Sequence, residues 1–538
     1  MIDATPSAAP RANRDVATAD NGFALTAGTG RVRAHYSLFR YSPLLFLLII
    51  IVADASQWAD PDLWIHLRAG QSILATWRVP AVDAYSYSAR GAIWIDHEWL
   101  CQALMALAYD HLGVLGLKLW KLLLVAATLG FTSMSLAETE AAPALQFKIM
   151  TVVAIALMVQ LQYRPQLFTY ALFAGLLVLL ARDWYGRRAS LLIVIPLMAI
   201  WANLHGGFIM GIAALGIYAG CMMISALSGD AARVRRAVGL GALTLAASAA
   251  TLLNPYGIGL WRLVARAATD PVSRIANDDW LPLSRAVEAQ WNNSHSGAIF
   301  VLCGVGLMAA TALAVALAPR AGDFPFVAIA AIMCAAAISS SRNLPFAIIA
   351  CASPLTLRLA RRGRHGGSDV QAHSSVNPWI AGLIAIVAIW RLGIVTGRLK
   401  SDIANPVGAV RFMRRNSLQG NLLNDFNWGD YLIWHSEPQS KVFIDGRYDT
   451  LYSYSLIREY ISFRFNLPGA QKTLDGWPHD FVLISPDTPA YKMMARESGW
   501  KLIYRDSVSA LFARAGTAGA LVTPHIQPAE KPAAEYFP

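Results

Sequence analysis

Two aspartates stand close together in the segment WADPDLWIHLRAG, residues 58–70. Asp60 and Asp62 follow soon after the apolar run SPLLFLLIIIVA, so they should lie where that run leaves a membrane. A carboxylate in that position can accept a proton from a hydroxyl group and act as a general base. Asp60 can also cap a helix that begins at Pro61, because aspartate before proline is a favourable N-cap pair. The two roles are compatible.

A second group of ionisable residues lies in WIDHEWL, residues 94–100. Asp96, His97 and Glu98 are candidates for acid–base chemistry or for positioning an acceptor. Adjacent histidine and glutamate also raise the question of a divalent metal, but this adjacency sets no ligand geometry. The sequence therefore predicts no definite cofactor and no metal site, and a divalent metal stays as the alternative.

Isolated basic residues border several apolar runs and could bind a phosphate group. Arg164 in YRPQLF and Arg342 in SRNLP carry forked donors that suit phosphate, and the alternative is that they reach lipid headgroups. His205 in ANLHGGF is predicted to bind phosphate or orient an acid, or else to pack through a hydrogen bond. Arg447 in FIDGRYD could reach the same site, although a structural turn with Asp445 is favoured.

The composition shows what kind of scaffold must position these residues. Of 538 residues, 56% are hydrophobic and 15% charged, whereas soluble domains have about 25% charged residues. This predicts an α-helical polytopic membrane protein. The sequence pI of about 9.5 could suit nucleic acid, but the basic residues lie in short loops between apolar runs, as the positive-inside rule expects. We therefore expect no nucleic-acid partner. The five cysteines show no metal-type spacing and imply no disulfide framework.

Eleven apolar runs approach the roughly 20 residues that a spanning helix needs. They are residues 38–55, 117–137, 147–162, 166–182, 189–204, 207–228, 237–254, 297–318, 324–340, 344–360 and 378–397. With a cytoplasmic N-terminus, the short outer loops contain only Arg164 and Arg342, and the inner loops hold most of the arginines. An odd number of spans then places the region after residue 400 outside. All the polar motifs named above share that outer side.

The chain divides into four predicted parts. They are a disordered cytoplasmic tail (1–37), a transmembrane domain (38–400) with long outer loops (56–116 and 255–296), a periplasmic α/β domain (401–515) and a disordered tail (516–538). The α/β prediction rests on short apolar runs that alternate with helical stretches. Loops as long as the two outer ones are usually functional.

This organisation resembles the GT-C superfamily of membrane glycosyltransferases. The pattern DPDLWIHLRAGQSIL with WIDHEWL, RPQLFTY and WANLHGG is similar to that of a large group of bacterial membrane proteins of this type, over most of residues 38–515. The resemblance implies a polyprenyl-phosphate-linked sugar donor, transfer at the outer face of the membrane, inversion of the anomeric centre, and an essential aspartate in the first outer loop. That role falls on Asp60 or Asp62. Better-known branches have Asp-Glu at this point, so both aspartates remain candidates, with Asp60 slightly favoured.

We therefore predict a glycosyltransferase of the bacterial inner membrane that acts on an envelope glycan, lipid or protein acceptor. The chain has no Walker A, GxSxG or zinc-protease motif, so the energy would come from the activated donor. The alternatives are a transporter or flippase of lipid-linked glycans and a non-catalytic subunit of an envelope polysaccharide assembly system. Transporters often show internal repeats and charges at mid-membrane, and this sequence shows neither clearly.

Overall fold

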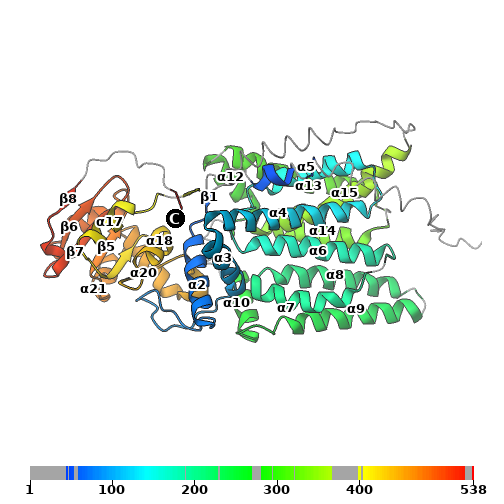
Figure 1. Ribbon diagram of the computed structural model, residues 1–538. Coiled ribbons are helices and arrows are strands. Elements are labelled where there is room, and N and C mark those ends of the chain that lie inside the picture. Colours follow the sequence, from blue (N-terminus) through cyan, green and yellow to red (C-terminus); the bar gives the residue numbers. More distant parts are fainter. Residues whose placement is uncertain are drawn as a thin grey trace, which may run out of the picture.

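The chain folds into a bundle of long helices that carries a smaller α/β domain at one end (Figure 1). This arrangement is seen in a computed structural model. The residues that it describes are 44–45, 48–53, 58–187, 189–227, 229, 231–269, 280–293, 295–319, 322–365, 398–401, 404–526 and 536–537. The predicted tail 1–37 lies outside them. The end of the bundle next to the α/β domain is called the domain end below.

Nearly parallel helices form the bundle (Figure 1). They are α4 (Val114–Ala137), α5 (Pro143–Leu157), α6 (Gln166–Trp184), α7 (Val194–Leu204) with the short η1 (Leu191–Ile193) before it, α8 (Phe208–Ala226), α9 (Ala231–Ala250), α13 (His295–Leu317), α14 (Phe324–Ser339) and α15 (Leu344–His365). Within the described residues, α4, α6, α8, α13 and α15 contain stretches long and apolar enough to cross a membrane, and α5, α14 and the η1–α7 segment are shorter apolar helices. A helix suits a bilayer because it satisfies its own backbone hydrogen bonds.

The predicted spans from 117–137 to 344–360 each coincide with one of these helices. The first predicted span is helical at residues 48–53 and otherwise lies largely outside the described residues, as does the span predicted at 378–397. The mostly helical membrane fold is therefore confirmed, and the total of eleven spans stays a prediction.

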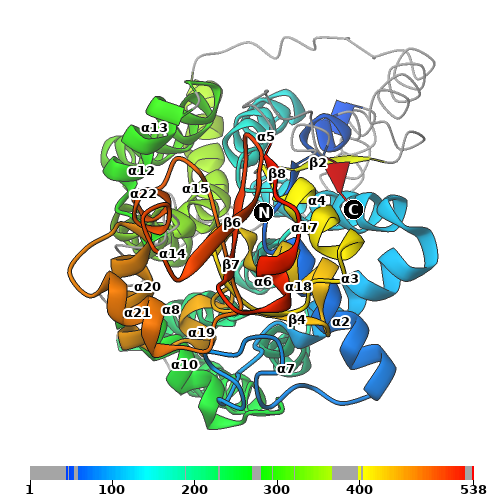
Figure 2. The same cartoon turned by 90° about the vertical axis from the view of Figure 1, so that its left-hand side faces the viewer.

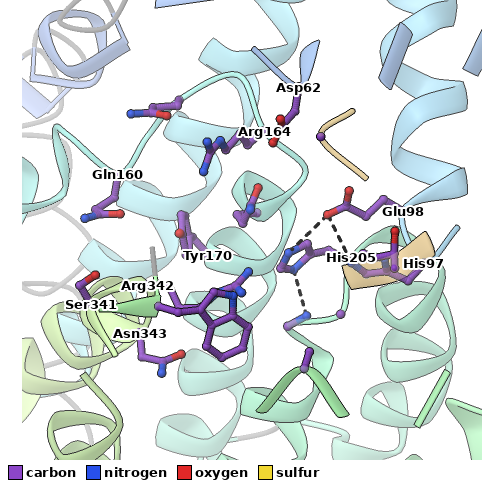
Figure 3. A pocket seen from close by; sticks show the side chains of 18 of the residues that line it. Asp62, His97, Glu98, Gln160, Arg164, Tyr170, His205, Ser341, Arg342 and Asn343 are labelled. Carbon is purple, nitrogen blue, oxygen red and sulfur yellow. Dashed lines mark hydrogen bonds and ion pairs between the residues drawn. The ribbon is translucent and has the colours of Figure 1, made fainter. Parts of the chain in front are cut away.

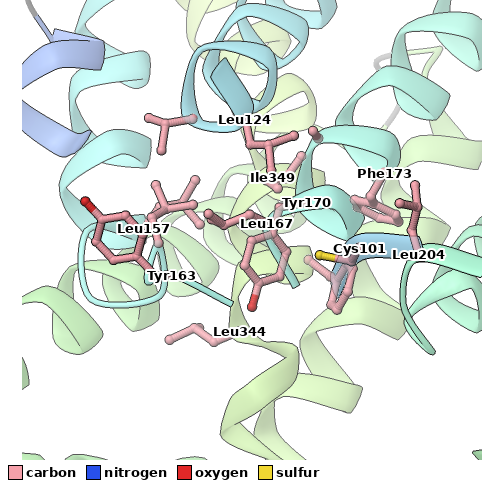
Figure 4. Packing of buried hydrophobic residues seen from close by; sticks show 14 of the residues in the cluster. Cys101, Leu124, Leu157, Tyr163, Leu167, Tyr170, Phe173, Leu204, Leu344 and Ile349 are labelled. Atoms are coloured by element: carbon pink, nitrogen blue, oxygen red, sulfur yellow. The ribbon is translucent and has the colours of Figure 1, made fainter. Parts of the chain in front are cut away.

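Apolar side chains fill the interior of the bundle (Figure 4). Leu167 and Phe173 of α6 are fully buried, and Tyr170 of the same helix packs its ring 5.7 Å from that of Phe346. Small residues let neighbouring helices approach closely. A Cβ added at Gly211 of α8 would lie 2.5 Å from the ring of Trp201, so only glycine fits against α7 there.

Shorter helices lie at the domain end of the bundle. The first long loop was predicted at residues 56–116, and its described part before α4 is 58–113. It contains α2 (Leu63–Thr76) and α3 (Trp99–Leu112), which run across the bundle axis between the bundle and the α/β domain (Figure 1). These two helices pack tightly, because a Cβ at Gly70 would lie 2.1 Å from the backbone oxygen of Gln102. Two amphipathic helices, α10 (Ile258–Thr269) and α12 (Leu283–Asn293), complete this end.

The α/β domain is built on a six-stranded sheet with the order β4-β3-β5-β7-β6-β8. Its strands are β3 (Gly420–Asn424), β4 (Ser440–Val442), β5 (Phe481–Ile484), β6 (Trp500–Arg505), β7 (Ala510–Arg514) and β8 (His525–Ile526). Its helices are α17 (Val407–Arg415), η4 (Phe426–Trp428), α18 (Gly429–Ser436), α19 (Tyr448–Leu451), α20 (Tyr454–Arg464), α21 (Ala470–Gly476) and α22 (Pro489–Met494). Strand β3 is parallel to β4 and β5, whereas β7 is antiparallel to β5 and β6. Figure 2 shows β6 and β7 in front of the bundle. The predicted α/β region is confirmed.

The C-terminal tail departs from the expected disorder where the structure describes it. Strand β9 (Tyr536–Phe537) joins β2 (Leu399–Ser401), which in turn pairs with β1 (Trp58–Ala59) of the first long loop. Phe537 is buried, with its ring 4.2 Å from that of Trp64. Strand β8 and the short helix η5 (Ala518–Leu521) also lie beyond residue 516.

The first long loop holds the α/β domain on the bundle. Trp64 of α2 packs edge-on against Tyr431 of α18, with ring centroids 5.3 Å apart. Arg447 donates to Asp83 at 2.5 Å, and Ser86 forms a parallel bridge with Val442 of β4. These contacts place the segment after β4 directly above the domain end of the bundle.

Candidate active site

A cavity of about 460 Å³ lies between the domain end of the bundle and the α/β domain. Residues from widely separated motifs line it (Figure 3). They are Asp62, His66, Asp96, His97, Glu98, Arg164, His205, Trp280, Arg342, Gly446 and Arg447, among others. The structure thus gathers in one space nearly all the residues singled out from the sequence. Asp60 is the exception, because it is not part of the lining.

The two aspartates of the first motif have different surroundings. Asp60 is buried, its Oδ2 accepts from Arg164 Nε at 2.6 Å, and its Oδ1 accepts from the backbone N–H of Asp62 at 3.0 Å. It therefore orders the turn before α2, which begins at Leu63, two residues later than expected from Pro61. Asp62 is half-buried and lines the cavity.

The α/β domain approaches Asp62 at a glycine. A Cβ added at Gly446 would lie 2.7 Å from Oδ1 of Asp62 and 2.4 Å from Oδ2 of Asp430. The backbone N–H of Gly446 donates to Asp430 Oδ1 at 3.1 Å. Burial raises the pKa of Asp430 well above its usual range, and the nearby Asp445 and Asp62 raise it further. A larger residue at position 446 would push the domain away from the cavity.

Two arginines face the cavity from connectors between helices (Figure 3). Arg164 lies between α5 and α6, and Arg342 lies in the short helix η3 (Ser341–Asn343) before α15. The Arg342 guanidinium sits 4.2 Å above the ring of Trp280. A planar guanidinium held against an aromatic face keeps its donors oriented, which lysine would not do as well.

Glu98 stands at the centre of three histidines. Its Oε1 lies 3.6 Å from His97 Nε2 and 3.6 Å from His205 Nε2, and its Oε2 lies 3.9 Å from His66 Nδ1. Burial raises the pKa of Glu98, and the nearby His66 opposes this. Burial also lowers the pKa of His66, so this histidine favours its neutral form. The cluster therefore gathers one carboxyl group and its imidazole neighbours in a poorly hydrated corner.

The hydrogen bonds of His205 determine its tautomer. Its Nδ1 accepts from the backbone N–H of Gly207 at 2.9 Å and lies 2.9 Å from the Thr169 hydroxyl. Trp201 Nε1 donates to that hydroxyl at 2.8 Å, so the hydroxyl hydrogen is free to donate a hydrogen bond to Nδ1. Burial lowers the pKa of His205 well below its usual range. The neutral ring consequently carries its proton on Nε2, facing Glu98.

This arrangement does not fit a divalent metal between His205 and Glu98. A metal needs a lone pair on the nitrogen that faces it, and Nε2 of His205 presents a proton there. Among the described residues, no group of three or more histidine, cysteine, aspartate or glutamate side chains is placed to hold a metal ion.

Asp96 is buried beside the Glu98 cluster. Its Oδ1 accepts from Gln102 Nε2 at 2.8 Å, and its Oδ2 has no hydrogen-bond partner among the described residues. Burial raises the pKa of Asp96 to about 8, and the nearby Glu98 contributes. The hydroxyl of Tyr256, from the NPYG motif, accepts from the Asp96 backbone N–H at 3.0 Å. Near pH 7 this carboxyl group is mostly protonated.

Arg447 forms the contact with Asp445 that was favoured from the sequence. Its Nε donates to Asp445 Oδ1 at 2.8 Å and its Nη2 to Asp445 Oδ2 at 2.6 Å. Its Nη1 donates to Asp83 of the first long loop, and its guanidinium lies 4.9 Å from the Trp94 ring centre. Two buried carboxylates thus hold this arginine at the edge of the cavity, and Asp83 was not anticipated.

Several amide side chains that were not predicted from the sequence also line the cavity. Gln160 and Gln162 precede Arg164 in the connector between α5 and α6, Gln166 is the first residue of α6, and Asn343 follows Arg342. The signal was present in VQLQYRPQ, where polar residues occur at every second position between two apolar helices. Such a period of two predicts a segment with one polar side, and the structure keeps that polar side although the connector is folded into turns and bends.

Comparison with known proteins gives a match in structure only. No family model and no curated protein matches the sequence. The apo oligosaccharyltransferase of Archaeoglobus fulgidus has a similar structure, with a TM-score of 0.54 and 12% identity over 90% of this chain and 75% of that chain. This chain has the GT-C fold. ArnT from Cupriavidus metallidurans bound to undecaprenyl phosphate is a weaker match, with a TM-score of 0.43 and 14% identity over 91% of this chain and all of that chain.

The GT-C fold of this chain explains why its motifs meet. The connectors α5–α6, α7–α8 and α14–α15 all lie at the domain end, and they supply Arg164, His205 and Arg342 respectively. Helices α2 and α3 of the first long loop cover the same space with Asp62 and Glu98. Residues from four separate parts of the sequence therefore surround one cavity.

Proposed function

We propose that this chain is a membrane glycosyltransferase that moves a sugar from a polyprenyl-phosphate-linked donor to an envelope acceptor. The observation that carries the proposal is the cavity, in which two arginines and several carboxyl groups share one space at the end of a membrane bundle. A solved oligosaccharyltransferase with the same fold supports this class of reaction. We place the reaction at the outer face of the bacterial inner membrane, with the N-terminus in the cytoplasm and the α/β domain outside.

Arg164 and Arg342 are the proposed ligands of the donor phosphate. Both are positively charged, both line the cavity, and each is held by a second group, Asp60 for Arg164 and Trp280 for Arg342. When the bond between the anomeric carbon and the phosphate oxygen breaks, negative charge grows on the phosphate. Oriented guanidinium groups stabilise that charge more in the transition state than in the ground state.

Asp62 is the proposed base. It takes the proton from the acceptor hydroxyl while that oxygen bonds to the anomeric carbon, and the polyprenyl phosphate leaves with the electron pair of the broken bond. Attack opposite the phosphate inverts the anomeric centre. Asp62 is preferred to Asp60 because Asp60 does not line the cavity and both of its oxygens already accept hydrogen bonds.

Glu98 is the second candidate for accepting or positioning a hydroxyl. The proton on His205 Nε2 points toward its carboxyl group, so His205 is proposed to orient Glu98 rather than to bind phosphate as a cation. His97 lies against the same carboxyl group. Asp96, mostly protonated near pH 7, is proposed to donate a hydrogen bond rather than to act as a base.

The proposal is tested by lipid binding together with lipid analysis of a deletion strain. Native mass spectrometry of the full chain with undecaprenyl phosphate should show a bound lipid, and the double variant Arg164→Gln/Arg342→Gln should lose it. A strain lacking the chain should accumulate a polyprenyl-phosphate-linked sugar. The wild-type gene should remove this accumulation when it is reintroduced, and the Asp62→Asn variant should not. Movement of the labelled lipid-linked sugar across vesicles, without sugar transfer, would indicate a flippase instead.

A further inference from the structure

The connector between α5 and α6, together with the first residue of α6, presents a row of polar side chains to the cavity. Gln160, Gln162, Arg164 and Gln166 all line it. The residues between them point into the protein, since Leu161 and Tyr163 are buried in the core and Pro165 begins the turn into α6. The backbone between these side chains follows turns and bends, since the N–H of Gln160 donates to the Leu157 oxygen and the N–H of Arg164 donates to the Gln162 oxygen, each at 2.9 Å. The three glutamines are called the amide row below.

The amide row keeps hydrogen-bonding capacity for a ligand. Among the described residues, the side chain of Gln160 makes no hydrogen bond, and Gln166 Oε1 is shielded from solvent without a partner. Gln162 donates from Nε2 to the Val159 backbone oxygen at 3.2 Å, which leaves its Oε1 open. A shielded amide oxygen without a partner is unfavourable unless a ligand or a water molecule donates a hydrogen bond to it.

Asn343 extends the same polar wall from another connector. It donates from Nδ2 to the Ala336 backbone oxygen at 3.2 Å, so its Oδ1 remains available. Figure 3 shows Gln160 and Asn343 on the side of the cavity away from Glu98 and His205, with Arg342 between. The cavity therefore has an amide side and a carboxyl–imidazole side.

We propose that the amide row and Asn343 form the subsite for the donor sugar, and that this sugar is uncharged and rich in hydroxyl groups. An amide offers both a donor and an acceptor, which matches a hydroxyl that also does both. The inference rests on the proposed function, because a phosphate at Arg164 brings the attached sugar next to Gln162. Two residues of chain span at most about 7 Å even when fully extended, so Gln162 stays close to Arg164.

The charges of the cavity favour a neutral sugar over an ionic one. On the connector, Arg164 is the charged residue that lines the cavity, and it is paired with Asp60. A cationic amino sugar would need a carboxylate within the subsite, whereas Glu98 lies on the other side and Asp62 lies beside Arg164 (Figure 3), where it is the proposed base. An anionic sugar would compete with the phosphate for Arg164. Amides bind hydroxyls without either conflict.

The test compares lipid affinities of the full chain in nanodiscs. The probes are undecaprenyl phosphate, undecaprenyl phosphate glucose and undecaprenyl phosphate 4-amino-4-deoxyarabinose. Wild type should bind the glucose-bearing lipid about tenfold more tightly than the bare lipid. Gln160→Leu and Gln162→Leu should each reduce that preference by roughly 3- to 10-fold, which is the range for the loss of one neutral hydrogen bond. The affinity for the bare lipid should stay unchanged in both variants.

Two further variants serve as controls. Gln71→Leu removes a glutamine that bonds Asp110 at 2.7 Å outside the cavity, and it should leave the preference intact. Gln160→Glu keeps the size of the side chain but adds a negative charge, and it should weaken binding of the neutral sugar and favour the amino sugar. Retained binding of bare lipid shows that each variant is folded.

The possible outcomes separate the two proposals. An unchanged preference in both Leu variants, with normal binding of the bare lipid, overturns the sugar subsite and leaves the proposed function standing. Tighter binding of the amino-sugar lipid by wild type also overturns the neutral-sugar inference. If wild type binds neither bare nor sugar-bearing lipid, the proposed function fails and the subsite fails with it.

Discussion

Arg164 donates from Nε to Oδ2 of Asp60 at 2.6 Å, which ties a connector of the bundle to the start of the first long loop. Asp60 is buried, and Arg164 faces the cavity. A buried charge that loses its partner is strongly destabilised. The aspartate therefore fixes the position of a proposed phosphate ligand and need not touch the substrate.

Asparagine substitutions should separate the roles of the two aspartates. Asp62→Asn should reduce transfer by about 10²–10⁴-fold, the usual contribution of a general base, with donor affinity unchanged. Asp60→Asn should instead weaken donor binding, because Arg164 loses its ionic partner. Asparagine caps about as well as aspartate, so neither loss can be assigned to the helix start. Product formation and lipid binding are measured on the same membranes. Full transfer by both variants and by the double variant would exclude both aspartates and leave Glu98 as the candidate.

Lysine substitutions should show whether the arginines act through their forked geometry. Arg342→Lys keeps the charge but loses the planar stack on Trp280, and Arg164→Lys loses the Nε contact to Asp60. Each should restore only part of the donor affinity that the corresponding Gln variant loses. Lipid titration by native mass spectrometry provides the measurement. Unchanged affinity in both Gln variants would mean that these side chains contact lipid headgroups instead.

The pKa of Asp96 predicts how stability depends on pH. A carboxyl whose pKa rises from 3.8 to about 8 binds its proton more tightly in the folded state. Its contribution to the free energy of unfolding therefore falls as pH rises from about 4 to 8, by at most about 1.4 kcal/mol per pH unit. Asp96→Asn should lack this loss and gain thermal stability over wild type at pH 8 relative to pH 5. Melting temperatures are measured for both proteins from pH 5 to pH 8. A difference in melting temperature that stays constant across that range would contradict the prediction.

Arg447 should contribute strongly to docking of the α/β domain. It is buried and bonded to Asp445 and to Asp83 of the first long loop. Arg447→Ala would leave two buried carboxylates uncompensated, at a cost of about 3–5 kcal/mol. Thermal unfolding, with protease sensitivity of the domain as a second readout, measures this. Arg458→Ala, at an exposed position on α20, is the matched control and should change stability little.

The orientation of the chain is open to a direct test. We expect the α/β domain outside the cytoplasm. A reporter that is active only after export should therefore be active when it is fused after Pro538. Arginines concentrate in the loops at the opposite end of the bundle, as the positive-inside rule expects for the cytoplasmic side. A cytoplasmic reporter that is fully active at the same position would reverse the orientation and place the cavity inside.

The architecture of the protein could be predicted from the sequence wherever a feature depends on the residues of one segment alone. Apolar runs of spanning length predicted the bundle helices, because hydrophobicity and length are properties of the segment itself. The change to short apolar runs after residue 400 predicted the α/β domain in the same way. The motifs in the connectors could be assigned to one end of the bundle by counting spans, so the gathering of Arg164, His205 and Arg342 was already implied.

Only the tertiary structure decided which side chains face the cavity. Asp60 and Asp62 are two residues apart and chemically identical, and the choice between them depends on Arg164, which lies far along the chain. The tautomer of His205 depends in the same way on Thr169 and Gly207, and the place of Arg447 depends on Asp83. The sequence by itself determined the helices and the side on which the motifs lie. Contacts between distant residues, which no local pattern contains, determined the direction of each functional group.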